Sequence, residues 1–378
     1  MTLPLRDVYA EPTLADVIPS VLASAGVPGE RNRLGLTDSA HTVVLLVDGM
    51  GWELLRRNRN TAPYLTDLPG RPIRAGFPTT TAASIASLGT GLPSGRHGIT
   101  GYQSYVEEAE TAVNWLSWTA AGTSLDQRDT LVPEQVQPHP TAFERGDAAG
   151  LAVTTVVPRA FDGSGLTRAV LRGGRFVGVS AYGDLLAEVV AAARAGERNL
   201  VYCYLSEVDT LGHVYGPDSQ AWLAQLTVVD RFVEQLAGAL PDGTRLLVTA
   251  DHGMVDSSRG RRVDFDRHPG LEEDVDVVAG EPRCRHIHTG RVDRVLERWA
   301  NELGDDFWVG TRDEVLSAGL FGPDPDPSVT GRIGDIVVIG RDEATVIRSH
   351  GERMLSALPG QHGALTADEL LVPLLQVR

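Results

Sequence analysis

Three short apolar, β-branched segments are each followed by an aspartate, and this pattern most limits the folds open to the chain. The segments span residues 42–47, 200–205 and 246–249, and the aspartates after them are Asp48, Asp209 and Asp251. Segments that are apolar on both faces are typical of parallel strands covered by helices. Ligands of such sheets bind beyond the carboxyl ends of the strands. We therefore expect the three aspartates to converge on one edge of one α/β sheet.

The rest of the chain predicts helices around this sheet and one insertion. Apolar residues recur at helical spacing over 185–195 and 222–240. From 258 to 348, charged stretches alternate with strand-like segments at 275–278 and 335–339 and a helix-like segment at 292–303. The apolar segment 372–375 indicates a return to the main sheet. These patterns predict an α/β core formed by residues 1–257 and 349–378, with a small α+β cap subdomain inserted at 258–348.

The composition narrows the ligands that suit this chain. Its 378 residues carry a formal net charge of −16, whereas nucleic acid and anionic membranes bind basic surfaces. We therefore expect neither a polymeric nucleic acid nor a membrane as partner. A small anionic substrate would need a local positive charge, which bound metal ions supply.

The cysteines and the N-terminal segment bear on the compartment. Cys203 and Cys284 lie far apart in the sequence, so we expect free thiols and a reducing environment. The first apolar stretch follows Asp7, Glu11 and Asp16, where a signal peptide has basic residues. No segment reaches the roughly 20 apolar residues that cross a bilayer. These features predict a soluble, cytoplasmic protein and leave its oligomeric state open.

Three consecutive hydroxyl side chains, Thr79 to Thr81, precede a segment with helical character at 81–88. The N-terminus of a helix offers free N–H groups and the positive end of the helix dipole, which suits a phosphate or an attacking oxyanion. A threonine hydroxyl is a weak nucleophile at neutral pH and needs an activator such as a metal ion. The alternative is that one threonine only caps the helix.

Two further motifs carry metal-ligand residue types. Asp209 precedes His213 by four residues, which places both on one face of a helix. Asp251 and His252 directly follow a predicted strand, where a turn lets both reach one cation. Each pattern alone also has a structural interpretation, as a surface pair or as a turn. Their common position at one sheet edge favours a metal site.

A histidine near the C-terminus completes the candidate ligands. His362 lies between Gln361 and a glycine, just before a predicted helix start, and His350 in a similar context is its competitor. His286 and His288 alternate along a predicted strand. This alternation can aim one of them at the substrate, but we expect both to be partly exposed. We assign no metal role to His41, His97, His139, His268, His286 and His288.

Together these motifs resemble the alkaline phosphatase superfamily, in particular its nucleotide pyrophosphatase/phosphodiesterase family. In that family a Pro-Thr-x-Thr motif, followed by Thr-Gly-Leu and then His-Gly, carries the nucleophile. This chain has Pro78-Thr79-Thr80-Thr81, Thr90-Gly91-Leu92 and His97-Gly98. A second family motif, Tyr-Leu-x-Glu-x-Asp followed by Gly-His and Tyr-Gly-Pro, is matched from Tyr204 to Pro217.

The resemblance implies a three-layer, alkaline-phosphatase-like α/β fold with a mostly parallel sheet. It also implies two zinc ions, other divalent metals being possible, and Thr81 as the nucleophile. One ion would be held by Asp209, His213 and His362. The other would be held by Asp48, Asp251, His252 and the Thr81 oxygen. Such mixed carboxylate and imidazole sets suit zinc.

The chain departs from the family pattern next to the nucleophile. Family members typically have Phe-Pro-Asn there, whereas this chain has Ala82-Ala83-Ser84. An asparagine that commonly contacts the phosphate is replaced in register by Tyr102, which we assign to substrate binding. Trp115 and Trp118 either stack a nucleotide base or pack in the interior.

The resulting functional hypothesis is a two-metal hydrolase that cleaves phosphodiester or pyrophosphate bonds through a phospho-threonine intermediate. Its partner would be a small phosphate ester, nucleotide-like in character. The alternatives are a phosphomonoesterase or phosphonate hydrolase of the same superfamily, a phosphate mutase, and a non-catalytic metal-binding protein.

Overall fold

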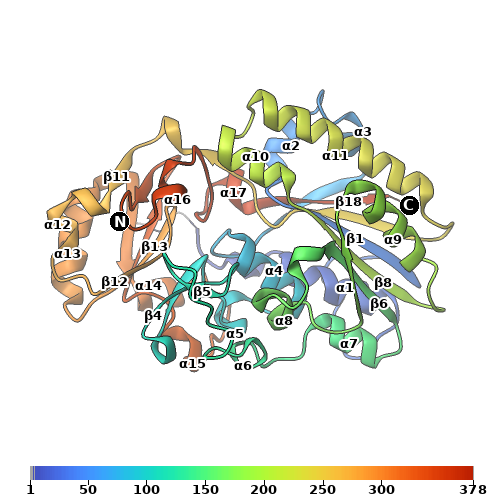
Figure 1. Ribbon diagram of the computed structural model, residues 1–378, viewed down its shortest axis with the longest axis horizontal. Helices are drawn as coiled ribbons and strands as arrows, with labels where there is room; N and C mark the ends of the chain where they lie inside the picture. The colour runs from blue at the N-terminus through green and yellow to red at the C-terminus, as the bar shows by residue number, and fades with distance from the viewer. Residues whose placement is uncertain (1–2, 4, 378) are drawn as a thin grey trace.

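The computed structural model describes residues 3 and 5–377, and a large central sheet organises it (Figure 1). Within these residues the sheet has seven strands in the order β2-β18-β9-β1-β8-β6-β7. The five strands from β9 to β7 are parallel, while β18 is antiparallel to both of its neighbours. The strands are β1 (His41–Val47), β2 (Gly70–Arg74), β6 (Ala152–Pro158), β7 (Arg175–Val179), β8 (Asn199–Leu205), β9 (Arg245–Thr249) and β18 (Leu371–Val377).

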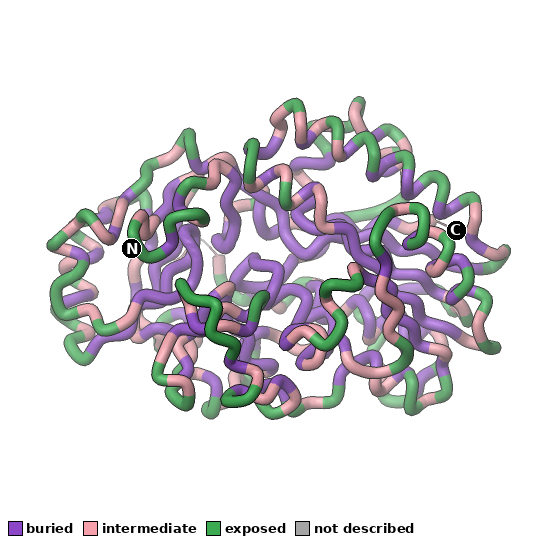
Figure 2. The backbone as a smooth tube through the Cα atoms, in the orientation of Figure 1, coloured by how far each residue is buried: buried purple, intermediate pink, exposed green. Residues whose placement is uncertain are grey.

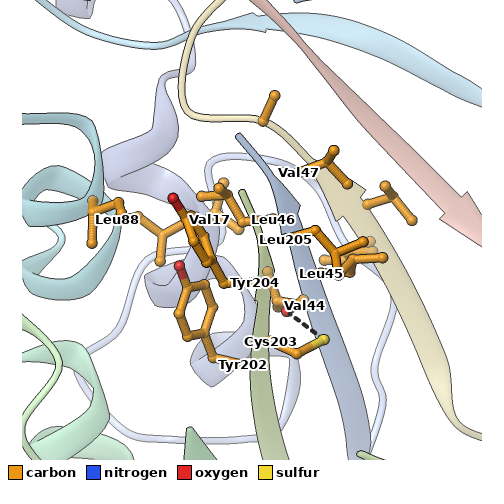
Figure 3. Packing of buried hydrophobic residues seen from close by; sticks show 14 of the residues in the cluster. Val17, Val44, Leu45, Leu46, Val47, Leu88, Tyr202, Cys203, Tyr204 and Leu205 are labelled. Atoms are coloured by element: carbon orange, nitrogen blue, oxygen red, sulfur yellow. Dashed lines mark hydrogen bonds between the residues drawn. The ribbon is translucent and has the colours of Figure 1, made fainter. Parts of the chain in front are cut away.

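Strand β1 lies at the centre of the sheet and is apolar on both faces. Residues Val43 to Val47 are fully buried, because helices cover both sides of this strand. Figure 3 shows the same packing in β8, where Tyr202 and Tyr204 point to one side and Cys203 to the other. Burying each such side chain contributes about 1.5–3 kcal/mol. The register pairs Val47 with Leu205, so β1 and β8 end at the same level.

Helices pack on both faces of the sheet (Figure 1). The backbone trace in Figure 2 is buried along the strands and exposed mainly on the outer helices and loops. The predicted three-layer α/β fold with a mostly parallel sheet is therefore confirmed. One face carries α1 (Val17–Ser24), α4 (Thr81–Thr90), α7 (Ala142–Ala148) and α8 (Gly165–Val170). The other carries α2 (Trp52–Arg57), α3 (Pro63–Asp67), α9 (Tyr182–Ala192), α10 (Glu207–Tyr215) and α11 (Gln220–Ala239). Among the described residues, no helix has both the length and the apolar character to cross a membrane.

A second, antiparallel sheet lies beside the core, at the left of Figure 1. Helix α13 (Val292–Leu303) packs on it, and Val295, Trp299 and Leu303 join its apolar interior. Another apolar cluster links this part to the core, because Phe77 contacts Phe321 with ring centroids 5.2 Å apart. The sheet is formed by β12 (Val277–Glu281), β13 (Cys284–His288), β14 (Phe307–Thr311) and β15 (Ile336–Gly340).

The division into a core (1–257 and 349–378) and a cap (258–348) stays a prediction. Residues 1, 2, 4 and 378 of the predicted core lie outside the described residues. A small sheet formed by β3 (Gln103–Val106), β4 (Thr111–Asn114) and β5 (Thr119–Ala120) was not predicted. It packs against β12.

Burial corrects one sequence expectation and decides between two alternatives in another. His286 and His288 are buried rather than partly exposed, because β13 lies between β12 and β15 and is covered by neighbouring segments. Trp115 and Trp118 are fully buried, with ring centroids 4.9 Å apart. Their indole N–H groups donate to Ser104 Oγ and to the Leu131 carbonyl. Both tryptophans therefore pack in the interior, and neither is placed to stack a base.

Candidate metal and catalytic site

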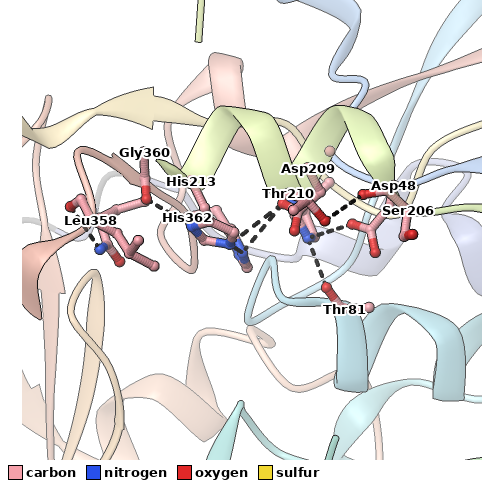
Figure 4. A network of polar contacts seen from close by, with 12 residues as sticks. Asp48, Thr81, Ser206, Asp209, Thr210, His213, Leu358, Gly360 and His362 are labelled. Atoms are coloured by element: carbon pink, nitrogen blue, oxygen red, sulfur yellow. Dashed lines mark hydrogen bonds and ion pairs between the residues drawn. The ribbon is translucent and has the colours of Figure 1, made fainter. Parts of the chain in front are cut away.

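The three aspartates that follow the strands meet at one edge of the sheet, together with three histidines. Figure 4 shows Asp48, Asp209, His213 and His362 of this cluster, with Thr81 beside them. Asp48 follows β1, Asp251 and His252 follow β9, and Asp209 lies in the first turn of α10, directly after β8. The potential ligand atoms form two groups, each within 4.8 Å. The first group consists of Asp48, Asp251 and His252. The second group consists of Asp209, His252 and His362.

His213, the remaining predicted ligand, lies beside the second group. Its Nε2 is 3.5 Å from Asp209 Oδ1 and 3.1 Å from His362 Nε2. Asp209 and His213 lie four residues apart in α10, so both side chains leave the same face of the helix. The structure thus brings all seven predicted side chains, including Thr81, into one site.

Backbone carbonyls fix the orientation of each histidine ring. Nδ1 lies 2.8 Å from the Gly360 oxygen in His213, 2.8 Å from the Thr79 oxygen in His362 and 2.9 Å from the Gly253 oxygen in His252. A carbonyl oxygen only accepts hydrogen bonds, so each neutral ring carries its proton on Nδ1 and directs the Nε2 lone pair into the site. This arrangement is typical of metal-ligating histidines.

The same geometry leaves electron pairs facing one another. The Nε2 atoms of His213 and His362 are 3.1 Å apart, and two lone pairs at this distance repel unless a cation or a proton lies between them. Asp48 Oδ1, Asp209 Oδ1 and Asp251 Oδ2 are buried and have no hydrogen-bond partner among the described residues. A buried carboxylate oxygen without a partner is costly, so this donor set fits divalent metal ions.

Burial also shifts the acidity of these groups. Desolvation, followed by the charges of Asp251 and Asp209, raises the pKa of Asp48 well above its ordinary value. Desolvation likewise raises the pKa of Asp209. In His362 desolvation, together with His252 and His213, lowers the pKa. The carboxylates lack a counter-charge, and metal ions would supply one.

Thr81 is the first residue of α4, and its Oγ1 lies 3.0 Å from His252 Nε2. The preceding Thr80 is the N-cap residue, but its side chain makes no capping hydrogen bond. Thr79 instead donates its hydroxyl proton to the Ala364 carbonyl, while its own carbonyl orients His362. Among the three hydroxyls, that of Thr81 therefore hydrogen-bonds to a histidine of the cluster. The alternative that one threonine only caps the helix is not supported, because the N-cap side chain forms no capping hydrogen bond.

Close backbone packing brings the loops together. Gly49 has φ +72°, and a Cβ there would lie 2.9 Å from the Cα of Asp209. Its N–H donates to Asp251 Oδ1 at 3.1 Å, as does the N–H of His252. A side chain at position 49 would therefore separate the loop after β1 from α10.

Two residues that sequence analysis missed support the ligands. Tyr204 donates its hydroxyl proton to Asp48 Oδ2. Glu369 accepts hydrogen bonds from the Ala364 N–H at 2.9 Å and from the fully buried Arg283, and so holds the loop that carries His362. The alternation of Tyr202 and Tyr204 in an otherwise apolar strand was the available signal for the first residue. No local pattern marks the pairing of Arg283 with Glu369, which are 86 residues apart.

The competing histidine lies elsewhere. His350 is exposed, and its backbone N–H donates to Asp266 rather than its ring entering the site. The other histidines without an assigned role are also absent from both ligand groups within the described chain.

Two cavities adjoin the site, and Thr81, Leu116, Asp209 and Thr210 line both of them. The first chamber, of about 210 Å³, is bounded mainly by apolar side chains; its further lining includes Ile85, Val157, Phe161, Leu166 and Leu171. The second chamber, of about 340 Å³, is the one that Tyr102 lines. Its further lining includes Thr80, His213, Glu281, Leu355 and His362.

Fold and site together define an alkaline-phosphatase-like α/β protein with a cluster of potential metal ligands at the carboxyl edge of its sheet. Comparison with solved structures agrees. Murine ectonucleotide pyrophosphatase/phosphodiesterase 5 matches with a TM-score of 0.70 at 19% identity, covering 88% of this chain and 87% of that one. An inactive variant of the murine protein in complex with AMP also gives 0.70, at 18% identity, covering 89% and 87% of the two chains. Human ectonucleotide pyrophosphatase/phosphodiesterase 5 matches with a TM-score of 0.67 at 18% identity, covering 88% of this chain and 87% of that one.

Sequence comparison gives the family. Residues 42–365 match the model of the type I phosphodiesterase/nucleotide pyrophosphatase family, and the chain belongs to this family. Human ectonucleotide pyrophosphatase/phosphodiesterase family member 7 is 38% identical over 80 residues, 19% of this chain and 18% of that protein. GPI ethanolamine phosphate transferase 1 of Aspergillus oryzae is 34% identical over 179 residues, 43% of this chain and 17% of that protein. The chain thus spans less than a fifth of these curated relatives.

Proposed function

We propose that this protein is a two-metal hydrolase that cleaves phosphodiester or pyrophosphate bonds of small, nucleotide-like esters, with Thr81 as the nucleophile. The observation that carries the proposal is the position of the Thr81 hydroxyl, 3.0 Å from His252 Nε2 and beside the buried Asp48 and the partly buried Asp209. Family membership supports the reaction class. The murine relative that binds AMP supports a nucleotide-like substrate.

The ligand groups suggest how the residues divide their roles. Asp48, Asp251 and His252, with Thr81, would hold one zinc ion, and Asp209, His213 and His362 would hold the other. When bound, the ions would lower the pKa of the Thr81 hydroxyl and neutralise charge on the phosphate oxygens. Other divalent metals remain compatible with the same donors.

The reaction then proceeds in two displacements on phosphorus. Thr81 Oγ loses its proton to solvent and attacks phosphorus, the bond to the leaving oxygen breaks, and phospho-threonine forms. Water attacks the same phosphorus in the second step, and the Thr81 oxygen leaves and regains a proton. N–H groups at the start of α4 lie beside this centre and would stabilise charge on the non-bridging oxygens.

The lining of the chambers favours a diester over a monoester. A terminal phosphate carries an additional charge, which phosphomonoesterases bind with further cationic groups. Among the described residues that line the two chambers, none is Arg or Lys. Two chambers that share Thr81 also provide room for the two substituents of a diester. The phosphomonoesterase alternative therefore ranks second.

Parallel hydrolysis of bis-p-nitrophenyl phosphate and p-nitrophenyl phosphate tests the proposal. We expect faster cleavage of the diester, loss of activity in EDTA, recovery with zinc, and inactivity of Thr81→Ala with unchanged metal content. Faster cleavage of the monoester would show that the substrate class is wrong. Two bound metals without any hydrolysis would favour a mutase or a binding protein instead. We also propose a cytoplasmic location, which cell fractionation would test.

A further inference from the structure

Residues 7–16 form an N-terminal segment that packs beside α4, the helix of the proposed nucleophile, and is not used by the proposed reaction. Its main chain is fixed to the large sheet, because the Arg74 N–H of β2 donates to the Pro12 carbonyl at 3.0 Å. Val8 is fully buried, and η2 (Leu14–Asp16), a short 3₁₀ helix, lies against α4. The segment therefore reaches α4 in a defined position.

The Tyr9 side chain of this segment holds main-chain groups on both sides of α4. Its hydroxyl oxygen accepts the Phe77 N–H and the Ser94 N–H, each at 3.3 Å. Phe77 precedes the first residue of α4, and Ser94 follows the last. Ser94 Oγ donates to the Phe77 carbonyl at 2.5 Å, so its lone pairs are free to accept the Tyr9 hydroxyl proton across 3.4 Å. One hydroxyl thus ties together the chain before and after α4.

Gly76 lets the Tyr9 hydroxyl approach the main chain this closely. Its φ is +110°, a conformation that favours glycine, and a Cβ there would lie 2.9 Å from the hydroxyl oxygen. The Phe77 side chain packs in the same apolar cluster as Val8 and against the Phe321 ring. Packing therefore fixes the side chain of Phe77, while the hydroxyls of Tyr9 and Ser94 fix its main chain.

A shift of the main chain at Phe77 would reach two groups of the site. Thr79 follows shortly after Phe77, and its carbonyl orients the His362 ring at 2.8 Å. The Thr79 hydroxyl donates to the Ala364 carbonyl at 2.8 Å, in the same loop. Thr81 then begins α4. A reacting group misplaced by about 1 Å can slow a reaction about 100-fold, so the anchoring of Phe77 bears directly on the rate.

We propose that Tyr9 is a positioning residue for the nucleophile. Its hydroxyl fixes the main chain at Phe77 and thereby sets the position of the Thr81 hydroxyl and of the N–H groups at the start of α4. This inference rests on the proposed phosphodiesterase function and makes catalysis depend on the N-terminal segment. Among the described residues, Tyr9 lines neither chamber and belongs to neither potential ligand group, so it acts through Thr81.

Tyr9→Phe tests this role, because it removes the hydroxyl and keeps the ring. With zinc-loaded protein and bis-p-nitrophenyl phosphate, kcat should fall about tenfold, since Thr81 reacts in both displacements, while KM stays within about twofold. The zinc content should be unchanged. Tyr105→Phe, which removes the hydroxyl of another half-buried tyrosine that lines neither chamber, should behave as wild type. An unchanged kcat, a rise in KM alone, or a loss of zinc would overturn the proposal.

Ser94→Ala provides a second variant, because it removes the donor to the Phe77 carbonyl. If both hydroxyls act on the same piece of main chain, their effects are not independent. The double variant with Tyr9→Phe should then lose about as much kcat as the more impaired single variant. A loss equal to the product of the two single losses would show that Tyr9 does not act through Phe77.

The outcomes separate this inference from the proposed function. If the wild type cleaves no phosphodiester, the proposed function fails, and hydrogen–deuterium exchange of the Phe77 and Ser94 amides decides whether Tyr9 fixes this region. Exchange about tenfold faster in Tyr9→Phe than in the wild type supports the positioning role, and unchanged exchange overturns it. Thermal unfolding verifies that each variant is folded.

Discussion

Replacing Asp251 with asparagine should stabilise the metal-free protein and weaken its binding of metal ions. The ligand oxygens of Asp48 and Asp251 lie within 4.8 Å of one another. Two unit charges at that separation repel by about 3.5 kcal/mol at an effective dielectric constant of about 20. Asp251 Oδ1 accepts N–H groups from Gly49 and His252, both at 3.1 Å, and an amide oxygen would keep both bonds. The substitution therefore removes charge with little change in shape.

The expected gain is smaller than the full repulsion. Burial raises the pKa of Asp48, so proton uptake already relieves part of the repulsion between the two carboxylates. We therefore expect the free energy of unfolding of the metal-free variant to rise by about 1–3 kcal/mol. The unfolding entropy of about 2.1 cal/mol/K per residue gives about 0.8 kcal/mol/K for 378 residues. The metal-free variant should therefore unfold about 1–4 °C above the wild type.

Metal ions should cancel or reverse this difference. An ion at a thousandfold excess over its Kd stabilises the folded state by about 4.1 kcal/mol, whereas hundredfold weaker binding reduces this to about 1.4 kcal/mol. Scanning calorimetry in EDTA and in zinc measures both differences. Asp293→Asn, at an exposed position of α13, is the control and should shift stability by less than about 0.5 kcal/mol. A variant that melts below the wild type in EDTA, or gains as much from zinc, would refute the reasoning.

Three further predictions concern the same site and its supports. Burial raises the pKa values of Asp48 and Asp209 above their ordinary 3.8, so the folded metal-free protein binds protons more tightly than the unfolded chain. Urea unfolding should therefore show that the free energy of unfolding falls as the pH rises above 3.8. Saturating zinc should suppress this pH dependence. Arg283→Met leaves the fully buried Glu369 without its ion-pair partner and should lower the free energy of unfolding by about 3–5 kcal/mol. Adding Glu369→Gln should recover much of this loss. An unchanged denaturation midpoint in the single variant would contradict this prediction. Tyr204→Phe removes the hydroxyl that donates a hydrogen bond to Asp48. A hydrogen bond to a charged group is worth about 1.5–3 kcal/mol, so kcat/KM should fall about 10–100-fold. Unaltered kinetics would show that the hydroxyl does not orient Asp48.

The sequence by itself determined the sheet and most of the site, because both depend on local patterns. A strand buried on two faces must be apolar throughout, so β1, β8 and β9 were visible as runs, and their ends located Asp48, Asp209 and Asp251. Parallel strands end at a common edge, so the convergence of these aspartates followed from topology. The four-residue spacing of Asp209 and His213 likewise required only helix geometry.

Only the tertiary structure decided relations between segments far apart in the chain. It selected His362 over His350, because the Thr79 carbonyl orients one ring while the other residue lies exposed. It paired Arg283 with Glu369 and left Glu281 without a partner in the second chamber. Burial and hydrogen-bond satisfaction depend on which distant groups approach, and this information is absent from local spacing. The sequence thus predicts which residues form the candidate site, whereas the packed fold decides which of the buried charged groups have partners.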